Sequence, residues 1–205
     1  MQPTAIIFDL GGVILLRSDQ PGRKRWSERL GISKDQLQET VWGAIGPGGP
    51  PPRAAAEVCQ RISAATGLSG DDAGQLLADF HAHWRLDPQL WPFIEIIHGR
   101  YRTAMIANAG HATRFAINNV LHIDSVFDPI VISAEEGVEK PNKRIYRLAA
   151  DRLRVTPAQC IFVDDRPENV VGAESAGMIG VHHVAAGETI CRVRELLGFC
   201  QGTAR

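Results

Sequence analysis

The chain has 205 residues, of which 44% are hydrophobic and 22% are charged, and this composition excludes a disordered chain. A formal net charge of −1 provides no basic field for a nucleic-acid backbone, so we expect no nucleic-acid partner. No apolar run approaches the ~20 residues that a membrane helix needs, so we expect no membrane association. The first residues lack the features of a signal peptide, which makes the cytoplasm the expected location.

The first predicted element is a short buried strand, and a long helical region follows it. The strand covers residues 5–8, and no further buried strand is expected until after residue 85. Four segments in between have the length and spacing of helices, at 25–30, 34–42, 53–66 and 71–84. We therefore expect a small helical cap domain at residues 18–85, inserted into a core domain made of residues 1–17 and 86–205.

Beyond residue 85, short apolar segments alternate with segments of helix length. The apolar segments lie at 103–106, 129–132 and 160–163, and residues 180–184 are a plausible fifth strand. The predicted helices lie at 112–121, 143–153, 167–176 and 188–197. Strands that are apolar throughout are typical of a parallel sheet covered on both faces. The alternation predicts an α/β fold with a doubly wound, Rossmann-like parallel sheet.

Ligands of such sheets bind beyond the carboxyl ends of the strands, so the residues directly after each strand are candidates for chemistry. Asp9 follows the first strand, and the pair Asp164-Asp165 follows the strand at 160–163. Two adjacent carboxylates repel each other and need a countercharge, which Mg²⁺ can supply to hard oxygen ligands. Asp165 is also compatible with a helix N-cap ahead of Pro167.

Two further features suit a phosphate site. Gly11 and Gly12 follow Asp9 closely and permit a tight turn whose N–H groups approach an anion. A carboxylate placed there could attack phosphorus and form an aspartyl-phosphate, although the short pattern also fits a plain turn. Lys140 lies directly before Pro141 and could neutralise a phosphate and the carboxylates, or it could be a surface lysine.

Taken together, these motifs resemble the haloacid dehalogenase superfamily of hydrolases, and the resemblance covers nearly the whole chain. The motifs that carry it are Phe8-Asp9-Leu10-Gly11-Gly12-Val13, Ile106-Ala107-Asn108, the run from Ser133 to Pro141 with Ile145-Tyr146, and Phe162-Val163-Asp164-Asp165 with Asn169 and Gly172-Ala173. The closest likeness is to the branch with a small helical cap, which includes bacterial sugar-phosphate phosphatases.

This resemblance implies a Mg²⁺-dependent hydrolase of small phosphomonoesters, such as sugar phosphates, that works as a monomer or homodimer. It implies that Asp9 is the nucleophile and that Lys140 holds the phosphate and balances Asp9. The implied metal ligands are Asp9, the carbonyl of Gly11, Asp164 and Asp165, with Asn169 supporting them. The implied phosphate-binding groups are the N–H groups of Leu10, Gly11 and Asn108, together with Lys140.

The chain departs from the family pattern at two positions. Most family phosphatases have an acid/base Asp where this chain has Gly11, and a Ser or Thr that binds phosphate where it has Ala107. His111 could replace the missing acid/base, although a surface role fits it as well. A protein that binds a phosphorylated ligand or a partner with little turnover is therefore the alternative. Dehalogenation is disfavoured, because the paired acids Asp164-Asp165 indicate a metal.

Overall fold

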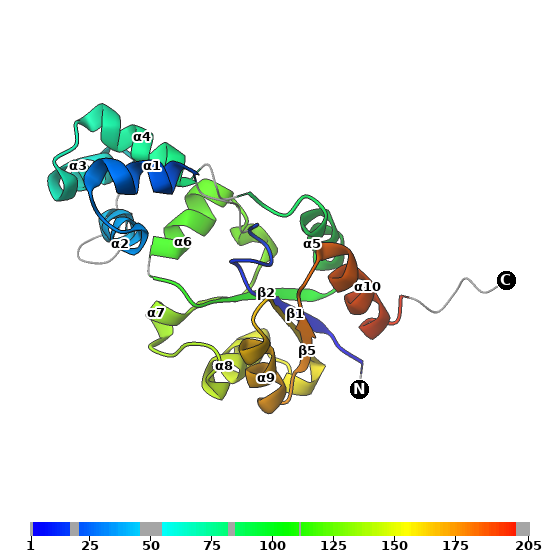
Figure 1. Cartoon of the computed structure of the whole chain (residues 1–205). Coiled ribbons are helices and arrows are strands. Elements are labelled where there is room, and N and C mark those ends of the chain that lie inside the picture. The colour runs from blue at the N-terminus through cyan, green and yellow to red at the C-terminus, as the bar shows by residue number, and fades with distance from the viewer. Residues whose placement is uncertain (1, 17–20, 46–54, 82–84, 111, 200–205) are drawn as a thin grey trace. The chain divides into compact units, whose positions relative to one another are not determined.

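The computed structural model describes residues 2–16, 21–45, 55–81, 85–110 and 112–199 (Figure 1). The chain forms two compact units. The first comprises Met1–Leu16, Leu86–Ala109 and Ile123–Arg205, and the second comprises Arg17–Arg85 and Gly110–His122. Within the described ranges, none of the helices combines the length and the apolar character that spanning a membrane requires.

The first unit is built on one sheet of five parallel strands in the order β3-β2-β1-β4-β5. The strands are β1 (Ala5–Phe8), β2 (Arg102–Ala107), β3 (Ile130–Ile132), β4 (Cys160–Asp164) and β5 (Ile179–His182). Each overlaps one of the five predicted strands, and the predicted α/β fold with a parallel sheet is confirmed. From β1 in the centre, the chain first adds β2 and β3 on one side of the sheet. It then crosses back to add β4 and β5 on the other side, so β1 and β4 are neighbours.

Helices cover both faces of this sheet (Figure 1). On one face, α8 (Lys143–Leu153) and α9 (Pro167–Ser175) pack on alternate strand residues such as Ile7, Ile106 and Phe162. On the other face lie α5 (Leu90–His98) and α10 (Ala186–Leu196), which contact each other. Burial on both faces explains why β1, β3 and most of β2 and β4 are apolar at consecutive rather than alternate positions.

Helix α5 is one that the sequence analysis did not predict. Its buried residues are Leu90, Phe93, Ile94 and Ile97, which is the spacing of a helix face that packs on a core. Pro92 lies in the first turn, where the missing N–H costs little. The Asp87 carboxylate accepts hydrogen bonds from the N–H groups of Gln89 and Leu90, both at 2.8 Å, and so fixes the start of the helix. The short helix α7 (Ser133–Glu136) was also not predicted.

The second unit is helical. It contains α1 (Pro21–Leu30), α2 (Lys34–Ile45), α3 (Ala55–Thr66), α4 (Gly70–His81), α6 (Ala112–Ala116) and a π-helical turn at Ile117–Leu121. Its core is formed by Trp26, Leu37, Val41, Val58, Ile62, Leu76 and Phe80. Phe115 packs against this core, although the sequence analysis placed residue 115 in the core domain. We therefore propose that the cap domain comprises residues 18–85 together with 110–122.

Candidate active site

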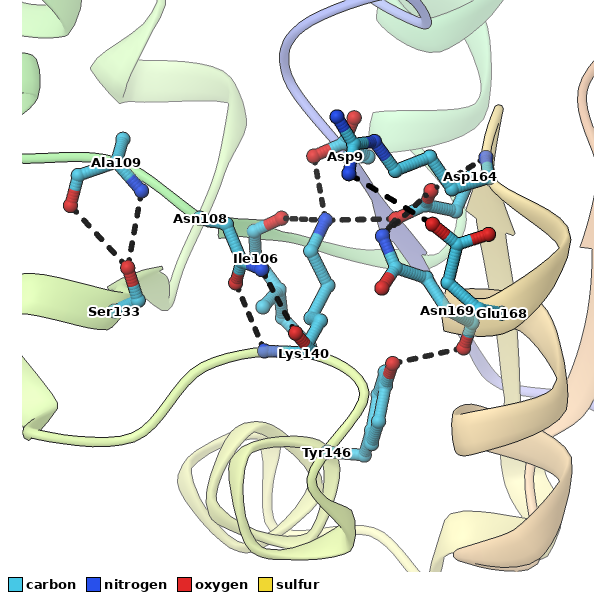
Figure 2. Close-up of polar contacts among 11 residues, drawn as sticks. Asp9, Ile106, Asn108, Ala109, Ser133, Lys140, Tyr146, Asp164, Glu168 and Asn169 are labelled. Atoms are coloured by element: carbon cyan, nitrogen blue, oxygen red, sulfur yellow. Dashed lines mark hydrogen bonds and ion pairs between the residues drawn. The ribbon is translucent and has the colours of Figure 1, made fainter.

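The first pair of predicted site residues meets at the carboxyl edge of the sheet. Phe8 of β1 is in register with Val163 of β4, and the N–H of Asp9 donates to the carbonyl of Val163 at 2.9 Å. Asp9 and Asp164 therefore leave neighbouring strands at the same edge (Figure 2). Both are buried, with Asp9 7% exposed and Asp164 fully covered, so their charges need compensation within the protein.

Lys140 supplies that compensation. Its Nζ atom lies 2.5 Å from Oδ1 of Asp9 and 2.7 Å from Oδ2 of Asp164, and it also donates to the carbonyl of Ile106 at 3.0 Å (Figure 2). An ammonium group has three donors, and these three acceptors use all of them. The Lys140 side chain is 1% exposed, which makes it part of the site and not a solvated surface lysine.

The position of Lys140 is fixed through its backbone by the side chain of Asn108. The Oδ1 atom of Asn108 accepts from the Lys140 N–H at 2.8 Å, and its Nδ2 atom donates to the Lys140 carbonyl at 2.9 Å (Figure 2). Next to it, Ser133 Oγ accepts from the N–H of Ala109 at 3.0 Å and ties the ends of β2 and β3 together. The sequence analysis assigned Asn108 only a backbone role. The feature that could have indicated the side-chain role, holding the Lys140 backbone, is an amide residue directly after a strand.

Asp164 is held from several sides. Its Oδ1 accepts from the Arg166 N–H at 2.9 Å and from Asn169 Nδ2 at 3.0 Å, and Asn169 Nδ2 lies 3.1 Å from Oδ2. Together with Lys140, these donors fix the plane of the carboxylate. The buried side-chain amide of Asn169 therefore supports Asp164. The resemblance implied a supporting role of this kind for Asn169.

The three carboxylates form a cluster that fits a divalent cation. Asp9, Asp164 and Asp165 each offer one oxygen, and these oxygens lie within 4.8 Å of one another. Oxygens on opposite sides of an octahedral Mg²⁺ are separated by about 4 Å, given Mg–O distances of about 2.1 Å. The largest separation in the cluster is somewhat longer than this, so the three oxygens would have to draw together slightly around a cation, and they stay predicted ligands. The carbonyl of Gly11, in the turn after β1, stays a predicted ligand.

The turn after Asp9 is closed by backbone hydrogen bonds. Gly12 has φ of +98°, and the N–H of Leu15 donates to the carbonyl of Leu10 at 2.8 Å. The backbone N–H of Leu10 faces the Asp9 carboxylate closely enough to favour its ionised form. Among the residues that the structure describes, apart from Gly11 and its two neighbours, none has an atom within 4 Å of the point where a side chain at Gly11 would begin.

The structure describes Ala107, the second departure from the family pattern, but not the candidate replacement for the missing acid/base. Ala107 ends β2, is 2% exposed and pairs in register with Ile132, so a methyl group takes the place of the hydroxyl that the resemblance implies. His111, the candidate replacement acid/base, lies outside the described residues.

Burial raises the pKa of Asp9 from 3.8 to about 6, and Asp164 adds to this rise, while Lys140 and the Leu10 N–H oppose it. The ionised carboxylate is thus costly in the metal-free protein. A cation at the cluster would favour the ionised form, because it adds positive charge beside the carboxylate. A cation bound at the cluster would therefore compete with a proton for Asp9 near pH 6.

The affinity for Mg²⁺ is accordingly expected to fall as the pH is lowered through about 6, approaching a tenfold loss per pH unit below it, because the proton and the cation compete for Asp9. Titration calorimetry at several pH values between 5 and 7.5 measures this dependence. In Asp9→Asn most of the dependence should disappear. An affinity that stays constant across this range would contradict the assignment of Asp9 as a ligand.

Comparison with known proteins adds to this geometry. The family model for haloacid dehalogenase-like hydrolases matches residues 3–177. A sesquiterpene phosphatase of Aspergillus oryzae is 25% identical over 197 residues, which cover 95% of this chain and 96% of that protein. A fructose-1-phosphate phosphatase of Escherichia coli is 27% identical over 180 residues, which cover 86% of this chain and 94% of that protein.

Solved structures show the same fold. A predicted hydrolase of this kind from Porphyromonas gingivalis superimposes with a TM-score of 0.65 at 20% identity, covering 96% of this chain and 98% of that chain. An enzyme from Bacteroides thetaiotaomicron, crystallised with magnesium and inorganic phosphate, gives 0.64 at 17% identity and covers 90% of this chain and 96% of that chain. At these identities the likeness concerns the fold.

Proposed function

This chain belongs to the haloacid dehalogenase-like hydrolases, and from that membership we propose that it is a Mg²⁺-dependent phosphomonoester hydrolase that forms a phospho-Asp9 intermediate. The observation that carries the proposal is the buried ammonium group of Lys140, which bridges Asp9 and Asp164 beside a third carboxylate, Asp165. Two relatives that align along most of their length have phosphatase names, which supports this chemistry.

In the first step, an Asp9 oxygen attacks phosphorus while the bond from phosphorus to the leaving oxygen breaks. The electron pair stays on the leaving oxygen, which takes up a proton from water. In the second step, a water oxygen attacks the phosphorus of phospho-Asp9, the bond to the carboxylate oxygen breaks, and the proton of the water passes to solvent. Asp9 is then a free carboxylate again.

The other residues act on charge and position. Lys140 is placed to balance Asp9 before the attack and the phosphoryl oxygens after it, because its Nζ atom already lies 2.5 Å from Asp9. The N–H groups of Gly11, Asn108 and Leu10 are proposed to bind the remaining phosphoryl oxygens. Mg²⁺ held by Asp9, Asp164, Asp165 and the Gly11 carbonyl would lower the repulsion between the carboxylates and the anionic substrate.

The substrate is proposed to be a small phosphorylated molecule. One relative is named for a sesquiterpene and the other for a sugar phosphate, so the comparisons favour a phosphatase without favouring one leaving group. A test panel should therefore contain sugar 1-phosphates, sugar 6-phosphates, an isoprenoid phosphate and p-nitrophenyl phosphate.

The protein is expected to release inorganic phosphate from at least one member of this panel, and the rate should fall roughly tenfold or more when a chelator removes Mg²⁺. Restoring Mg²⁺ should restore the rate. Equal rates with and without chelator would overturn the metal dependence. If no substrate turns over but vanadate binds in the presence of Mg²⁺, the protein is a phosphate-binding protein. Chloride release from a haloacid without metal would indicate a dehalogenase.

A further inference from the structure

Tyr146 is a buried tyrosine close to the site that neither the metal nor the phosphate would touch. It lies in α8 and is fully covered, and its ring packs edge-on against Phe162 with the ring centroids 5.1 Å apart. Its hydroxyl donates to the backbone carbonyl of Asn169 at 2.8 Å (Figure 2). A buried phenol needs such a partner, but the identity of the partner is informative here.

Asn169 is the residue that connects this hydroxyl to the carboxylate cluster. It lies in the first turn of α9, and its side-chain amide donates to both oxygens of Asp164, at 3.0 and 3.1 Å. One side of Asn169 is thus fixed by Tyr146 and the other side fixes Asp164. The three residues form a continuous series of hydrogen bonds from the core of the first unit to a predicted metal ligand.

Gly172 shows that this contact between the two helices is unusually close. A Cβ atom at Gly172 would lie 2.7 Å from the carbonyl oxygen of Pro141 and 2.9 Å from the hydroxyl of Tyr146. Only a glycine permits α9 to approach the segment that carries Lys140 and the hydroxyl of Tyr146 so closely. Contacts at Gly172 therefore fix the position of α9 relative to both the Pro141 carbonyl and the Tyr146 hydroxyl.

The orientation of Asp164 depends on this arrangement, because its carboxylate has several competing donors. Lys140 donates to Oδ2 and the Arg166 N–H donates to Oδ1, while Asn169 reaches both oxygens. A small shift of the Asn169 amide would let the carboxylate rotate toward the remaining donors. Rotation would redirect the oxygen lone pairs that face Asp9 and Asp165.

We infer that Tyr146 is a positioning residue for the metal site, which acts through Asn169 to hold the carboxylate of Asp164 in the orientation that binds Mg²⁺. The inference rests on the proposed function, because it takes Asp164 as a ligand. Tyr146 is fully covered and its hydroxyl is bonded to Asn169, so its effect should appear in metal affinity.

Tyr146→Phe tests this, because it keeps the ring that packs on Phe162 and removes only the hydroxyl. The dissociation constant for Mg²⁺, measured by calorimetry on the metal-free protein, is expected to rise about tenfold, the low end of what supporting residues contribute. Tyr101→Phe is the matched control. Tyr101 lies at the amino end of β2, away from the carboxyl ends where the site lies, and its ring packs edge-on against Phe199. The Tyr101→Phe variant should therefore bind Mg²⁺ like the wild type.

A double-mutant cycle with Asn169→Ala separates positioning from a general effect on folding. If Tyr146 acts through Asn169, adding Tyr146→Phe to Asn169→Ala should change the Mg²⁺ dissociation constant less than about twofold. Additive effects, or an unchanged constant in the single variant Tyr146→Phe, would overturn the inference while leaving the proposed function intact. A wild-type protein that binds no Mg²⁺ would overturn both.

Discussion

Replacing Asp9 with asparagine is expected to lower the rate of phosphate release by about 10⁴–10⁶-fold, the size of effect seen when a nucleophile is removed. Asparagine keeps the shape of the side chain. It cannot attack phosphorus, and it leaves the Nζ atom of Lys140 with Asp164 as its charged partner. The loss should therefore fall on the chemical step.

The measurement is the initial rate of phosphate release with p-nitrophenyl phosphate and with the best substrate of the panel. Asp128→Asn is a suitable control, because this exposed carboxylate precedes β3 at the opposite edge of the sheet and should be dispensable. The wild-type protein, quenched in acid during turnover, should carry phosphate on Asp9, and Asp9→Asn should carry none. A variant with more than a tenth of the wild-type rate would show that another group or water attacks the substrate.

The sequence was most informative where local pattern and topology coincide. The strands at 5–8 and 160–163 are apolar because both faces of the sheet are covered. Asp9 and Asp164 stand out because a carboxylate directly after such a strand has no packing role. Parallel strands bring their carboxyl ends to one edge, so the proximity of these two residues followed from the fold. The place of Lys140 came from the resemblance, since many surface lysines precede a proline.

Contacts between distant residues could not be predicted in this way. The hydrogen bonds between the Asn108 side chain and the Lys140 backbone join residues 32 positions apart in the sequence. The hydrogen bond from Tyr146 to Asn169 joins residues 23 positions apart. No local pattern records such pairs. Helix α5 was missed for a different reason, since Pro92 obscures its spacing, and residues 110–122 join the helical unit through the packing of Phe115.

The two departures from the family pattern define what limits the proposed enzyme. The charged half of the site is assembled, since Lys140 contacts both buried carboxylates. The group that would protonate the leaving oxygen is absent at Gly11. Substrates whose leaving oxygen departs readily as an anion should therefore be turned over better than alkyl phosphates, for which protonation matters most.

Replacing Gly11 with aspartate is expected to raise kcat/KM for a sugar 6-phosphate by about 10²–10⁴-fold, the usual contribution of a general acid or base. The described residues leave room for this side chain, because none of them beyond the two chain neighbours has an atom within 4 Å of the new Cβ position. The backbone at Gly11 is also outside the positive-φ region. The gain should be smaller for p-nitrophenyl phosphate, whose leaving group needs no proton.

Gly11→Asn is the matched control, since it has the same size and offers no acidic proton. A gain that is confined to aspartate and to the poor leaving group would show that the site binds and attacks phosphate competently and that proton transfer alone limits turnover. An equal gain with asparagine would assign the effect to packing or hydrogen bonding. No gain with either would mean that protonation is not limiting, and the methyl group of Ala107, where a hydroxyl would contact phosphate, would become the next position to change.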